Sequence, residues 1–470
     1  VNGSKVGEHR GGYDPFSFDI TNALKGDGEQ EIVIGVWDPS DGGYQPRGKQ
    51  VRKPEGIWYT PTTGIWQTIW LEPVAVGGID ELRIVPDFDQ SQIRVTVKTS
   101  RDAKGVTVRA VLEDQIEVVS RAEGKASDTL ILKLSNPKPW SPASPHLYDL
   151  GVEVIGADGK VLDVVESYAA LRKISLEKDA SGAKRMLLNG KPLFHFGPLD
   201  QGFWPDGLYT APTDEALKYD IEITKQLGFN MIRKHVKVEP ARWYFWCDKL
   251  GMLVWQDMPS GDAAAPWDPF GKHDGKELTR SAESAGNYHH EWENIMRALQ
   301  NVPSIVVWVP FNEGWGQFET VAVTKRVQEL DPNRLVNCAS GGNDFPVGDI
   351  YDLHRYPGPI APQPDGVRAA VLGEYGGLGL PLSGHTWQSE KNWGYKSFKT
   401  KEELTAAYLD LLGKLAPLIR DKELSAAVYT QTTDVEIEIN GLMTYDREVL
   451  KMPLEKIAEA NQKISDSLSN

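Results

Sequence analysis

Residues 305–316 decide the fold: Ile305-Val306-Val307-Trp308-Val309-Pro310-Phe311-Asn312-Glu313-Gly314-Trp315-Gly316. The run before Asn312 is wholly apolar, which is typical of a strand buried on both faces of a parallel sheet. An amide, a carboxylate and a glycine-rich turn follow it directly. The pattern therefore predicts a buried strand that presents Glu313 at its carboxyl end with little steric cover.

Seven further apolar runs resemble this one, and helical patterns lie between several of them. Eight strands over about 280 residues match the size of a closed barrel better than an open sheet. A doubly wound fold would also need a glycine-rich phosphate loop after an early strand, and the sequence has none. We therefore expect a (β/α)8 TIM barrel over residues 181–470. The other predicted strands are Leu193–Pro198, Met231–His235, Leu253–Met258, Leu335–Ala339, Ile350–His354, Ala369–Gly373 and Ala426–Thr430, and the predicted helices are Asp214–Leu227, Glu239–Leu250, Glu291–Leu299, Phe318–Leu330, Glu402–Leu418 and Leu454–Leu468.

The chain before the barrel has the short, alternating runs of antiparallel sheets. Phe16–Ile20 and Glu31–Val36 predict strands within residues 1–76. Residues 77–180 repeat the rhythm about every 10 residues, which predicts an immunoglobulin-like sandwich. The expected fold class is thus multidomain, with β-sandwich domains followed by a TIM barrel. The strands expected in the second sandwich are Leu82–Val85, Ile93–Val97, Val106–Leu112, Thr129–Leu134, Tyr148–Val154 and Val161–Tyr168.

Composition narrows the class of partner. The chain has 51 basic and 66 acidic residues, a net charge of −15, which disfavours nucleic acid and anionic lipid. The longest apolar runs fall short of the roughly 20 residues that a membrane helix needs, so no span is expected. Cys247 and Cys338 are expected to be buried free thiols. The chain opens at Val1 without a signal pattern, so we expect its natural N-terminus to be missing; a periplasmic or extracellular location is favoured over a cytoplasmic one.

Polar side chains follow the apolar runs, at the barrel edge where active sites form. Glu374, in Leu372-Gly373-Glu374-Tyr375-Gly376-Gly377, is presented much as Glu313 is, and strands four and seven would bring the two face to face. Glycosidic cleavage needs such a pair, one protonated and one ionised. The alternative is that both are ordinary rim residues with basic partners. The full set after the runs is Asp200, Gln201, Arg233, His235, Gln256, Asp257, Asn312, Glu313, Ser340, His354, Tyr356, Glu374, Gln431 and Asp434.

Other chemistries have weaker patterns. His289 and His290 are adjacent and lack the i, i+4 spacing of a zinc helix. Asp349 and His354 would point to different faces of one strand. Ser340 lacks the full Gly-x-Ser-x-Gly pattern of a nucleophile elbow. We therefore expect no metal and no cofactor.

At this point the chain resembles glycoside hydrolase family 2, the group of β-galactosidases, β-glucuronidases and β-mannosidases. Gly11-Gly12-Tyr13 and Thr63-Gly64-Ile65-Trp66-Gln67 are similar to the latter half of that family's sugar-binding jelly roll, so residues 1–76 would be its C-terminal part, truncated at the N-terminus. The barrel stretches 228–233, 251–256, 303–313 and 373–376 are similar to its strands. The resemblance implies that Glu313 is the general acid/base, Glu374 the nucleophile, Asn312 a contact to the 2-hydroxyl and Tyr356 a partner of the nucleophile.

Two departures bear on the sugar. No tryptophan stands at the end of the eighth strand, in Tyr429–Asp434. The Asn-x-Lys element that the family's glucuronidases use to grip a carboxylate is missing around Trp387–Lys396. The resemblance thus implies an exo-acting, retaining β-glycosidase, β-galactosidase-like, with a carbohydrate as its partner. Mannoside or arabinoside specificity stays open, glucuronide is disfavoured most, and a non-catalytic carbohydrate-binding protein is a further alternative. Asp200, Arg233, His235, Asp257, His354 and Tyr356 are expected to hold hydroxyls or tune the carboxylates, and Trp204, Trp315 and Trp387 to stack on sugar.

Overall fold

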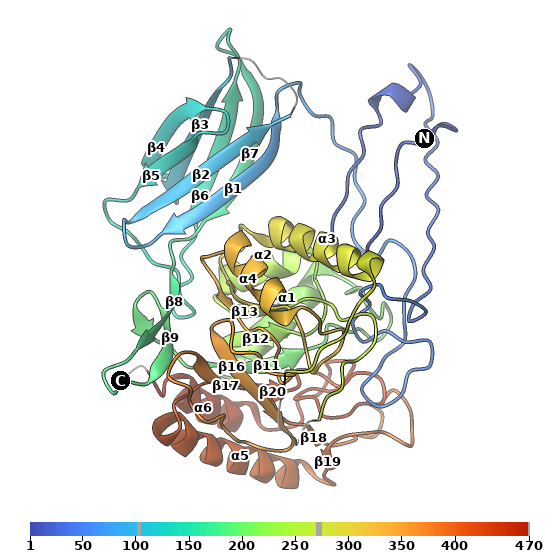
Figure 1. The fold of residues 1–470 in the computed structure, drawn as a ribbon, viewed down its shortest axis with the longest axis vertical. Helices are drawn as coiled ribbons and strands as arrows, with labels where there is room; N and C mark the ends of the chain where they lie inside the picture. Colours follow the sequence, from blue (N-terminus) through green and yellow to red (C-terminus); the bar gives the residue numbers. More distant parts are fainter. Residues whose placement is uncertain (101–104, 269–274, 469–470) are drawn as a thin grey trace.

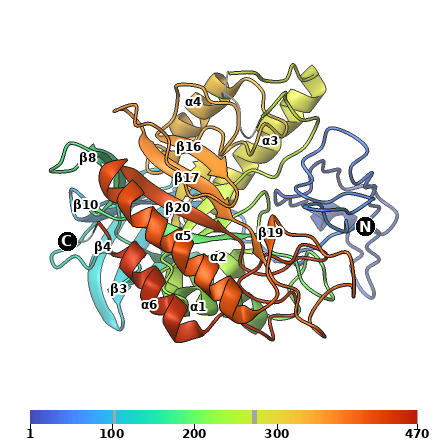
Figure 2. The same cartoon turned by 90° about the horizontal axis from the view of Figure 1, so that it is seen from below.

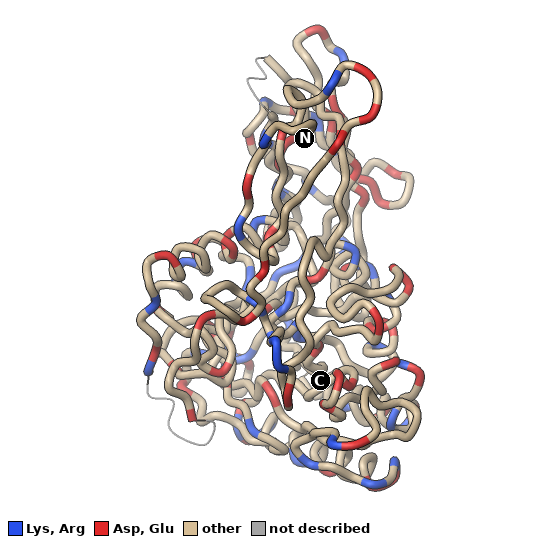
Figure 3. The backbone as a smooth tube through the Cα atoms, turned by 90° about the vertical axis from the view of Figure 1, so that its right-hand side faces the viewer, with Lys and Arg blue, Asp and Glu red and all other residues tan. Residues whose placement is uncertain are grey.

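A computed structural model describes residues 1–100, 105–268 and 275–468. Figure 1 shows three parts: an extended N-terminal segment (blue), a β-sandwich (cyan and teal) and a barrel ringed by helices (green to red). Basic and acidic residues are interspersed over all three parts, as Figure 3 shows, so the net negative charge is not gathered in one of them. No helix within these ranges is long and apolar enough to cross a membrane.

The barrel is one eight-stranded parallel sheet, which confirms the fold expected for this part of the chain. All eight predicted runs are strands, in the order β15-β14-β13-β12-β11-β20-β17-β16. The outermost pair, β15 and β16, is joined by no strand ladder within the described residues; instead the backbone N–H of Asp349 donates to the carbonyl oxygen of Val336 at 2.8 Å. The strand bounds are β11 His195–Asp200, β12 Met231–Lys234, β13 Leu253–Asp257, β14 Ile305–Val309, β15 Leu335–Val336, β16 Ile350–Arg355, β17 Ala369–Gly376 and β20 Leu424–Thr430.

Among the described residues six helices cover the barrel wall. Each overlaps a predicted segment, but the third begins at Ala282, well before the predicted start at Glu291. Three of them begin at a threonine or serine whose side chain accepts from a backbone N–H of the first turn: Thr213, Ser281 and Thr400. Figure 2 shows α5 and α6 lying together across one side of the sheet. The bounds are α1 Asp214–Gln226, α2 Ala241–Leu250, α3 Ala282–Leu299, α4 Thr320–Leu330, α5 Lys401–Asp421 and α6 Leu454–Ser465, so no helix follows β15 or β16 in the described chain.

The sandwich consists of two antiparallel sheets, β1-β2-β5 and β4-β3-β6-β7. Inward residues such as Val95, Leu112, Leu132 and Val152 form one buried core between them. Six of these strands were predicted, and β4 was missed because its polar sequence, Glu117–Lys125, has hardly any buried residues. The bounds are β1 Ile79–Asp87, β2 Gln92–Thr99, β3 Thr107–Asp114, β4 Glu117–Lys125, β5 Thr129–Lys133, β6 Tyr148–Ile155 and β7 Val161–Ala169.

A small three-stranded sheet closes the bottom of the barrel. It has the order β10-β9-β8, with bounds Lys191–Pro192, Lys184–Leu188 and Ile174–Lys178. Met186 and Leu188 pack in one core with barrel residues such as Trp255 and Val307. The guanidinium of Arg185 donates to the carbonyl oxygens of Leu424 and Ile419 at 2.7 and 2.9 Å, which ties this sheet to the barrel wall. The opposite end of the barrel is left for the polar side chains.

The strands predicted for residues 1–76 do not form. Among these residues the structure has only a short 3₁₀ helix, Thr21–Ala23, and isolated bridges such as Gln50 with Tyr59. A strand needs a neighbouring strand to satisfy its backbone hydrogen bonds, and residues 31–36 have none, so the prediction was wrong there. Val33 and Trp37 are accordingly 76% and 85% exposed.

Candidate active site

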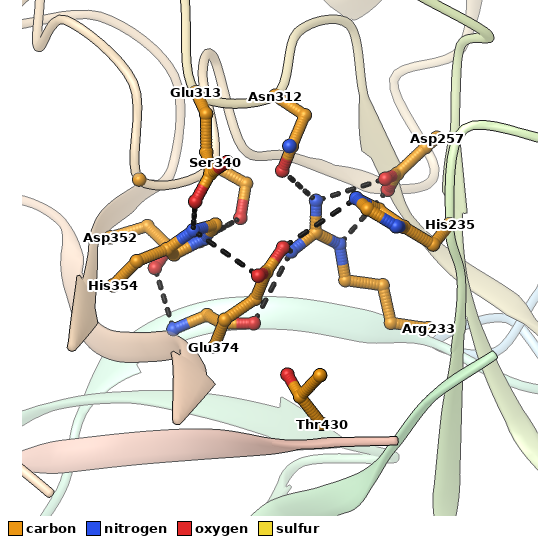
Figure 4. Close-up of polar contacts among 12 residues, drawn as sticks. Arg233, His235, Asp257, Asn312, Glu313, Ser340, Asp352, His354, Glu374 and Thr430 are labelled. Atoms are coloured by element: carbon orange, nitrogen blue, oxygen red, sulfur yellow. Dashed lines mark hydrogen bonds and ion pairs between the residues drawn. The ribbon is translucent and has the colours of Figure 1, made fainter. Parts of the chain in front are cut away.

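Polar side chains from at least six barrel strands meet at the carboxyl edge of the sheet. Figure 4 shows Arg233 of β12, Asp257 of β13, His354 of β16 and Glu374 of β17 converging on one another, with Asn312 and Glu313 entering from the chain after β14. All of them are buried. Eight of the predicted site residues form this one cluster, which we call the carboxylate cluster: Arg233, His235, Asp257, Asn312, Glu313, His354, Tyr356 and Glu374.

Arg233 is the centre of the carboxylate cluster. It is fully buried, and its guanidinium pairs with both carboxylate oxygens of Asp257 at 3.1 and 2.9 Å. It also donates to Oδ1 of Asn312 at 2.7 Å and to Oε1 of Glu374 at 3.3 Å. A planar guanidinium with five donors suits this task because several acceptors can be held in fixed directions at once. Arg233 and Asp257 thus position their neighbours. The charge of Arg233 also lowers the pKa of Glu374, which agrees with the expectation that it tunes a carboxylate.

The two glutamates approach each other across His354. Nδ1 of His354 lies 2.8 Å from Oε1 of Glu313 and 3.6 Å from Oε2 of Glu374, as Figure 4 shows. One carboxylate oxygen of each glutamate and the histidine nitrogen all lie within 4.8 Å of one another. Glu313 has a left-handed backbone, with φ of +49°, which costs a non-glycine residue energy and is found mainly at functional sites.

The surroundings separate the proton affinities of the two carboxyls. Burial and the neighbouring charge of Glu374 raise the pKa of Glu313. Burial alone would also raise the pKa of Glu374, but the charges of His354 and Arg233 outweigh it and lower that pKa. For His354, burial is outweighed by the charges of Glu374 and Glu313, so its pKa is raised. The pair therefore favours one protonated and one ionised glutamate, the arrangement that two-carboxylate catalysis requires.

Tyr356 contacts Glu374 directly. Its hydroxyl donates to Oε2 of Glu374 at 2.5 Å and lies 2.7 Å from Oγ1 of Thr430. The Tyr356 ring stacks on Tyr395 with centroids 3.6 Å apart. Thr430 and Tyr395 were not expected here, because neither belongs to a motif. Thr430 could have been found as the last residue of a predicted strand.

A second line of contacts holds His354. Its Nε2 lies 2.9 Å from Oγ of Ser340, and that hydroxyl donates to Oδ2 of Asp352 at 2.5 Å. Asp352 also accepts from the backbone N–H of Gly373 at 2.7 Å, beside Glu374. Ser340 was expected among the polar residues that follow the strands, whereas no role was expected for Asp352. Ser340 directly follows a predicted strand, and Asp352 stands two residues before His354, on the same face of its strand. These positions were the signals that could have identified both residues.

Asp200 lies just outside the carboxylate cluster. Its carboxylate accepts from Nζ of Lys234 at 2.7 Å, and Lys234 also binds Glu239 at 2.9 Å. Within the cluster, His235 contacts Gln201, the residue next to Asp200: its Nδ1 lies 3.0 Å from Oε1 of Gln201, and its Nε2 lies 3.5 Å from Oε1 of Glu374. His235 is therefore next to Glu374, while Asp200 is engaged by a lysine.

The three tryptophans expected to stack on sugar lie in different surroundings. Trp315 adjoins the carboxylate cluster, with its ring 6.2 Å from that of His235. Trp204 is buried beneath the guanidinium of Arg447, 3.9 Å from the ring centroid. Trp387 is 40% exposed and meets Tyr445 edge-on, with ring centroids 5.9 Å apart. Only Trp315 is thus brought to the site by a direct contact.

The N-terminal segment reaches the mouth of the barrel. The backbone N–H groups of Arg47 and Gly48 donate to the carbonyl oxygen of Ser260 at 2.8 and 3.0 Å. Trp58 packs on Trp315 with ring centroids 4.8 Å apart, and the hydroxyl of Tyr59 hydrogen-bonds Glu438. Residues 47–59 therefore pack against barrel loops beside the carboxylate cluster. No sequence pattern predicted this contribution.

Two described groups of side chains have a spacing that could hold a cation: Glu313, His354 and Glu374 in the cluster, and His385, Asp446 and Glu448 on the surface. In the first, a histidine with a raised pKa and the nearby guanidinium of Arg233 already supply positive charge. That donor set fits proton transfer and nucleophilic attack better than metal binding, since metal-bound histidine must be neutral.

Comparison with known proteins identifies relatives of both the sandwich and the barrel. Residues 78–172 match the family description "Glycosyl hydrolases family 2", and residues 182–356 match "Glycosyl hydrolases family 2, TIM barrel domain". A β-galactosidase of Halalkalibacterium halodurans is 24% identical over 354 residues, covering 72% of this chain and 33% of the relative. A β-galactosidase of Thermoanaerobacter pseudethanolicus is 27% identical over 339 residues, covering 67% and 40%. A putative β-glucuronidase of Formosa agariphila is 26% identical, covering 67% and 36%.

Solved structures share the fold. A putative β-galactosidase of Bacteroides fragilis has a TM-score of 0.72 at 20% identity, covering 100% of this chain and 72% of that one. Bacteroides uniformis β-glucuronidase 2 has a TM-score of 0.70 at 19% identity, covering 95% and 58%. The chain spans about a third to two fifths of the length of the curated relatives named above.

Proposed function

Because the chain belongs to glycosyl hydrolases family 2, we propose that it is a retaining, exo-acting β-glycosidase that hydrolyses terminal O-glycosidic bonds. The observation that carries the proposal is the approach of the Glu313 and Glu374 carboxylates to within 4.8 Å, with opposite shifts in pKa. Retaining enzymes hold their carboxyls about 5–5.5 Å apart, whereas inverting enzymes leave about 6.5–9.5 Å for a water. The shorter spacing supports retention.

In the first step, a carboxylate oxygen of Glu374 attacks the anomeric carbon. The bond from that carbon to the leaving oxygen breaks, and Glu313 transfers its proton to this oxygen. The lowered pKa of Glu374, held down by the charges of His354 and Arg233 against the effect of burial, keeps the attacking group ionised. The raised pKa of Glu313, caused first by burial, keeps the acid protonated. The product is a glycosyl ester on Glu374 and a free alcohol.

In the second step, Glu313 takes a proton from water. The water oxygen bonds to the anomeric carbon, the ester bond to Glu374 breaks, and both carboxyls return to their starting states. Asn312 is suited to hold the sugar during both steps: Arg233 occupies its Oδ1, while its Nδ2 is buried without a hydrogen-bond partner among the described residues. We assign that donor to the 2-hydroxyl of the glycone.

A β-galactoside is the first candidate substrate, because curated β-galactosidases are among the relatives. Mannosides and arabinosides are the neutral alternatives. Glycosides of acidic sugars are also candidate substrates, because a putative β-glucuronidase is another relative and β-glucuronidases are among the similar structures. A carbohydrate-binding protein without turnover is the rival function, and the intact glutamate pair argues against it.

The test is a panel of nitrophenyl β-glycosides, with proton NMR of the first sugar released. We expect release of nitrophenol from at least one glycoside and a β-anomer as the first product. Glu313→Gln and Glu374→Gln should lose this activity. Glu455→Gln, at an exposed carboxyl of α6, is their matched control and should keep full activity. Sugar binding without turnover by the unmodified protein would establish the rival function, and an α-anomer as first product would replace retention with inversion.

A further inference from the structure

Lys49 is a buried cation without an acceptor. It is 5% exposed, and no hydrogen bond or ion pair joins its ammonium to any other described residue. Nζ faces two aromatic rings, with centroids 5.4 Å away in Tyr59 and 5.9 Å away in Trp315. These distances are close to the limit of about 6 Å for a cation–π contact.

The other buried lysines of the described chain are all satisfied. Lys234 binds the carboxylates of Asp200 and Glu239. Lys237 donates to Glu239 and to the carbonyl oxygens of Gly202 and Tyr209. Lys451 donates to Asp434 and to the carbonyl oxygen of Ile439. Burial of an ammonium is costly unless hydrogen bonds and an opposite charge compensate, so Lys49 is the exception that needs an explanation.

The backbone holds Lys49 in place. The carbonyl oxygen of Lys49 accepts from the N–H of Tyr59 at 2.9 Å, and the N–H of the preceding Gly48 donates to Ser260 at 3.0 Å. Gly48 has φ of +60°, and a Cβ there would lie 2.5 Å from the carbonyl oxygen of Val236, so only glycine fits. The ammonium is thus presented from a preorganised turn, which reduces the entropy that binding would otherwise cost.

The ring of Trp315 links Lys49 to the carboxylate cluster: its centroid is 5.9 Å from Nζ of Lys49 and 6.2 Å from the ring of His235. The Lys49 charge reaches both glutamates, since it helps to lower the pKa of Glu374 and opposes the rise in the pKa of Glu313. Burial is the first cause of the lowered pKa of His235, and the Lys49 charge is the next, ahead of the Arg233 charge. His235 Nε2 lies 3.5 Å from Oε1 of Glu374. A group that stands beside the nucleophile faces the sugar whose anomeric carbon is attacked, which is the glycone.

We propose that Lys49 is a specificity-determining residue, supplied by the N-terminal segment, that binds an oxyanion on the glycone. The inference rests on the proposed function and specifies its substrate class: a sugar bearing a carboxylate or a sulfate ester. A neutral hydroxyl could accept a hydrogen bond from the ammonium, but only an oxyanion would place a negative charge in direct contact with it, because Glu313 and Glu374 act on Lys49 without an ion pair. The lack of an Asn-x-Lys element around Trp387–Lys396 therefore does not leave the site without a cation for acidic sugars.

The experiment compares kcat/KM for four nitrophenyl glycosides: the β-galactoside, the β-galacturonide, the β-glucuronide and the 6-sulfated β-galactoside. We expect the unmodified protein to prefer at least one anionic substrate over the neutral one. The uronide and sulfate arms identify which oxyanion is used. Lys49→Gln should lower kcat/KM for that substrate about 100-fold, because one partner of a buried charge pair is lost, and change the neutral one far less. Lys53→Gln, at an exposed lysine of the same segment, is the control and should change neither.

Two outcomes would overturn the inference while leaving the proposed function intact. One is an equal loss for charged and neutral substrates in Lys49→Gln, which is what a merely structural lysine would give. The other is a preference of the unmodified protein for the neutral galactoside. If no glycoside is cleaved, the proposed function fails on its own, and calorimetry with free galacturonate, glucuronate and galactose 6-sulfate decides the inference. Binding of one that weakens in Lys49→Gln supports it, and no difference from galactose overturns it.

Discussion

Nδ1 of His354 lies 2.8 Å from Oε1 of Glu313, and the same nitrogen is 3.6 Å from the second glutamate, Glu374. One histidine nitrogen therefore serves two carboxylates, and it acts unequally on them. It hydrogen-bonds Glu313 and contributes the largest of the charge effects that hold down the pKa of Glu374 against burial. The roles of two identical side chains follow from this shared neighbour.

Glu313→Gln should lose activity in proportion to the need for acid assistance. With poor leaving groups we expect a fall in kcat/KM of about 10²–10⁴-fold, the usual contribution of a general acid. With a dinitrophenyl leaving group, which departs without a proton, the loss should be much smaller. Steady-state kinetics over a series of aryl leaving groups measures this. An equal loss across the series would remove the acid role from Glu313.

Glu374→Gln should abolish turnover for all leaving groups, by about 10⁴-fold or more, because the covalent route is lost. A 2-fluoro glycoside should inactivate the unmodified protein, and mass spectrometry of the digest should place the sugar on the peptide that contains Glu374. A label on the peptide of Glu313 would instead reverse the two assignments. An unchanged circular dichroism spectrum checks that the variant is folded.

His354→Gln should move the pH profile of kcat/KM toward higher pH on both sides. Loss of the cation lets burial raise the pKa of Glu374, so the acidic limb, where the nucleophile ionises, shifts up. The pKa of Glu313, already raised by burial, should rise further because His354 lowers it through a hydrogen bond and its charge. The alkaline limb, where the acid loses its proton, therefore shifts up as well. A profile that only falls in height would contradict the shared role of His354.

Arg233→Met should destabilise the fold by about 3–5 kcal/mol, because it leaves the carboxylate of Asp257 buried without its partner. Asp257 is 1% exposed, and burial raises its pKa to about 6 even with Arg233 present. Urea unfolding followed by tryptophan fluorescence gives the free energy. Arg326→Met breaks an exposed pair with Glu293 and should cost less than about 1 kcal/mol. Similar losses in both variants would rule out this account.

The docking of the N-terminal segment should weaken as the pH rises from about 4.5 to about 8. The N–H of Gly12 donates to Oε2 of Glu291 on α3, at 3.2 Å. Burial, and then the charge of Asp14, raise the pKa of Glu291 to about 8. A carboxyl whose pKa is higher in the folded state stabilises the fold fully only below its unfolded pKa, and this contribution is lost as pH rises through about 8. Tm and tryptic cleavage of residues 1–76, measured from pH 4.5 to pH 8, report the loss. Glu291→Gln should remove this pH dependence, and its persistence would assign the effect to another group.

The sequence was sufficient to predict the parts of the fold that depend on apolar burial. Runs such as Ile305–Val309 and Ala369–Leu372 are buried on both faces, so their composition alone predicts strands. The polar strand β4 lacks that signal. Glu31–Val36 has the alternation of a strand, yet a strand also requires a paired neighbour, and alternation says nothing about whether one is present.

The same limit applies to the site. Glu313 and Glu374 could be predicted because each follows an apolar run and precedes a glycine-rich turn. Lys49 could not, because its position depends on contacts between residues 47–59 and loops more than 200 residues away. The expectation for Trp387 was based on residue type, and the structure places that side chain against Tyr445.

No strand ladder joins β15 and β16 in the described barrel, and this affects how the protein unfolds on heating. We expect the barrel to open first between these two strands, because backbone hydrogen bonds join every other adjacent pair of strands in the described barrel. Side-chain hydrogen bonds cross this gap, among them the one between Ser340 and His354, at 2.9 Å. A contact that holds the histidine of the active site therefore also holds the barrel closed. On heating, activity should therefore be lost before the circular dichroism spectrum of the folded barrel changes.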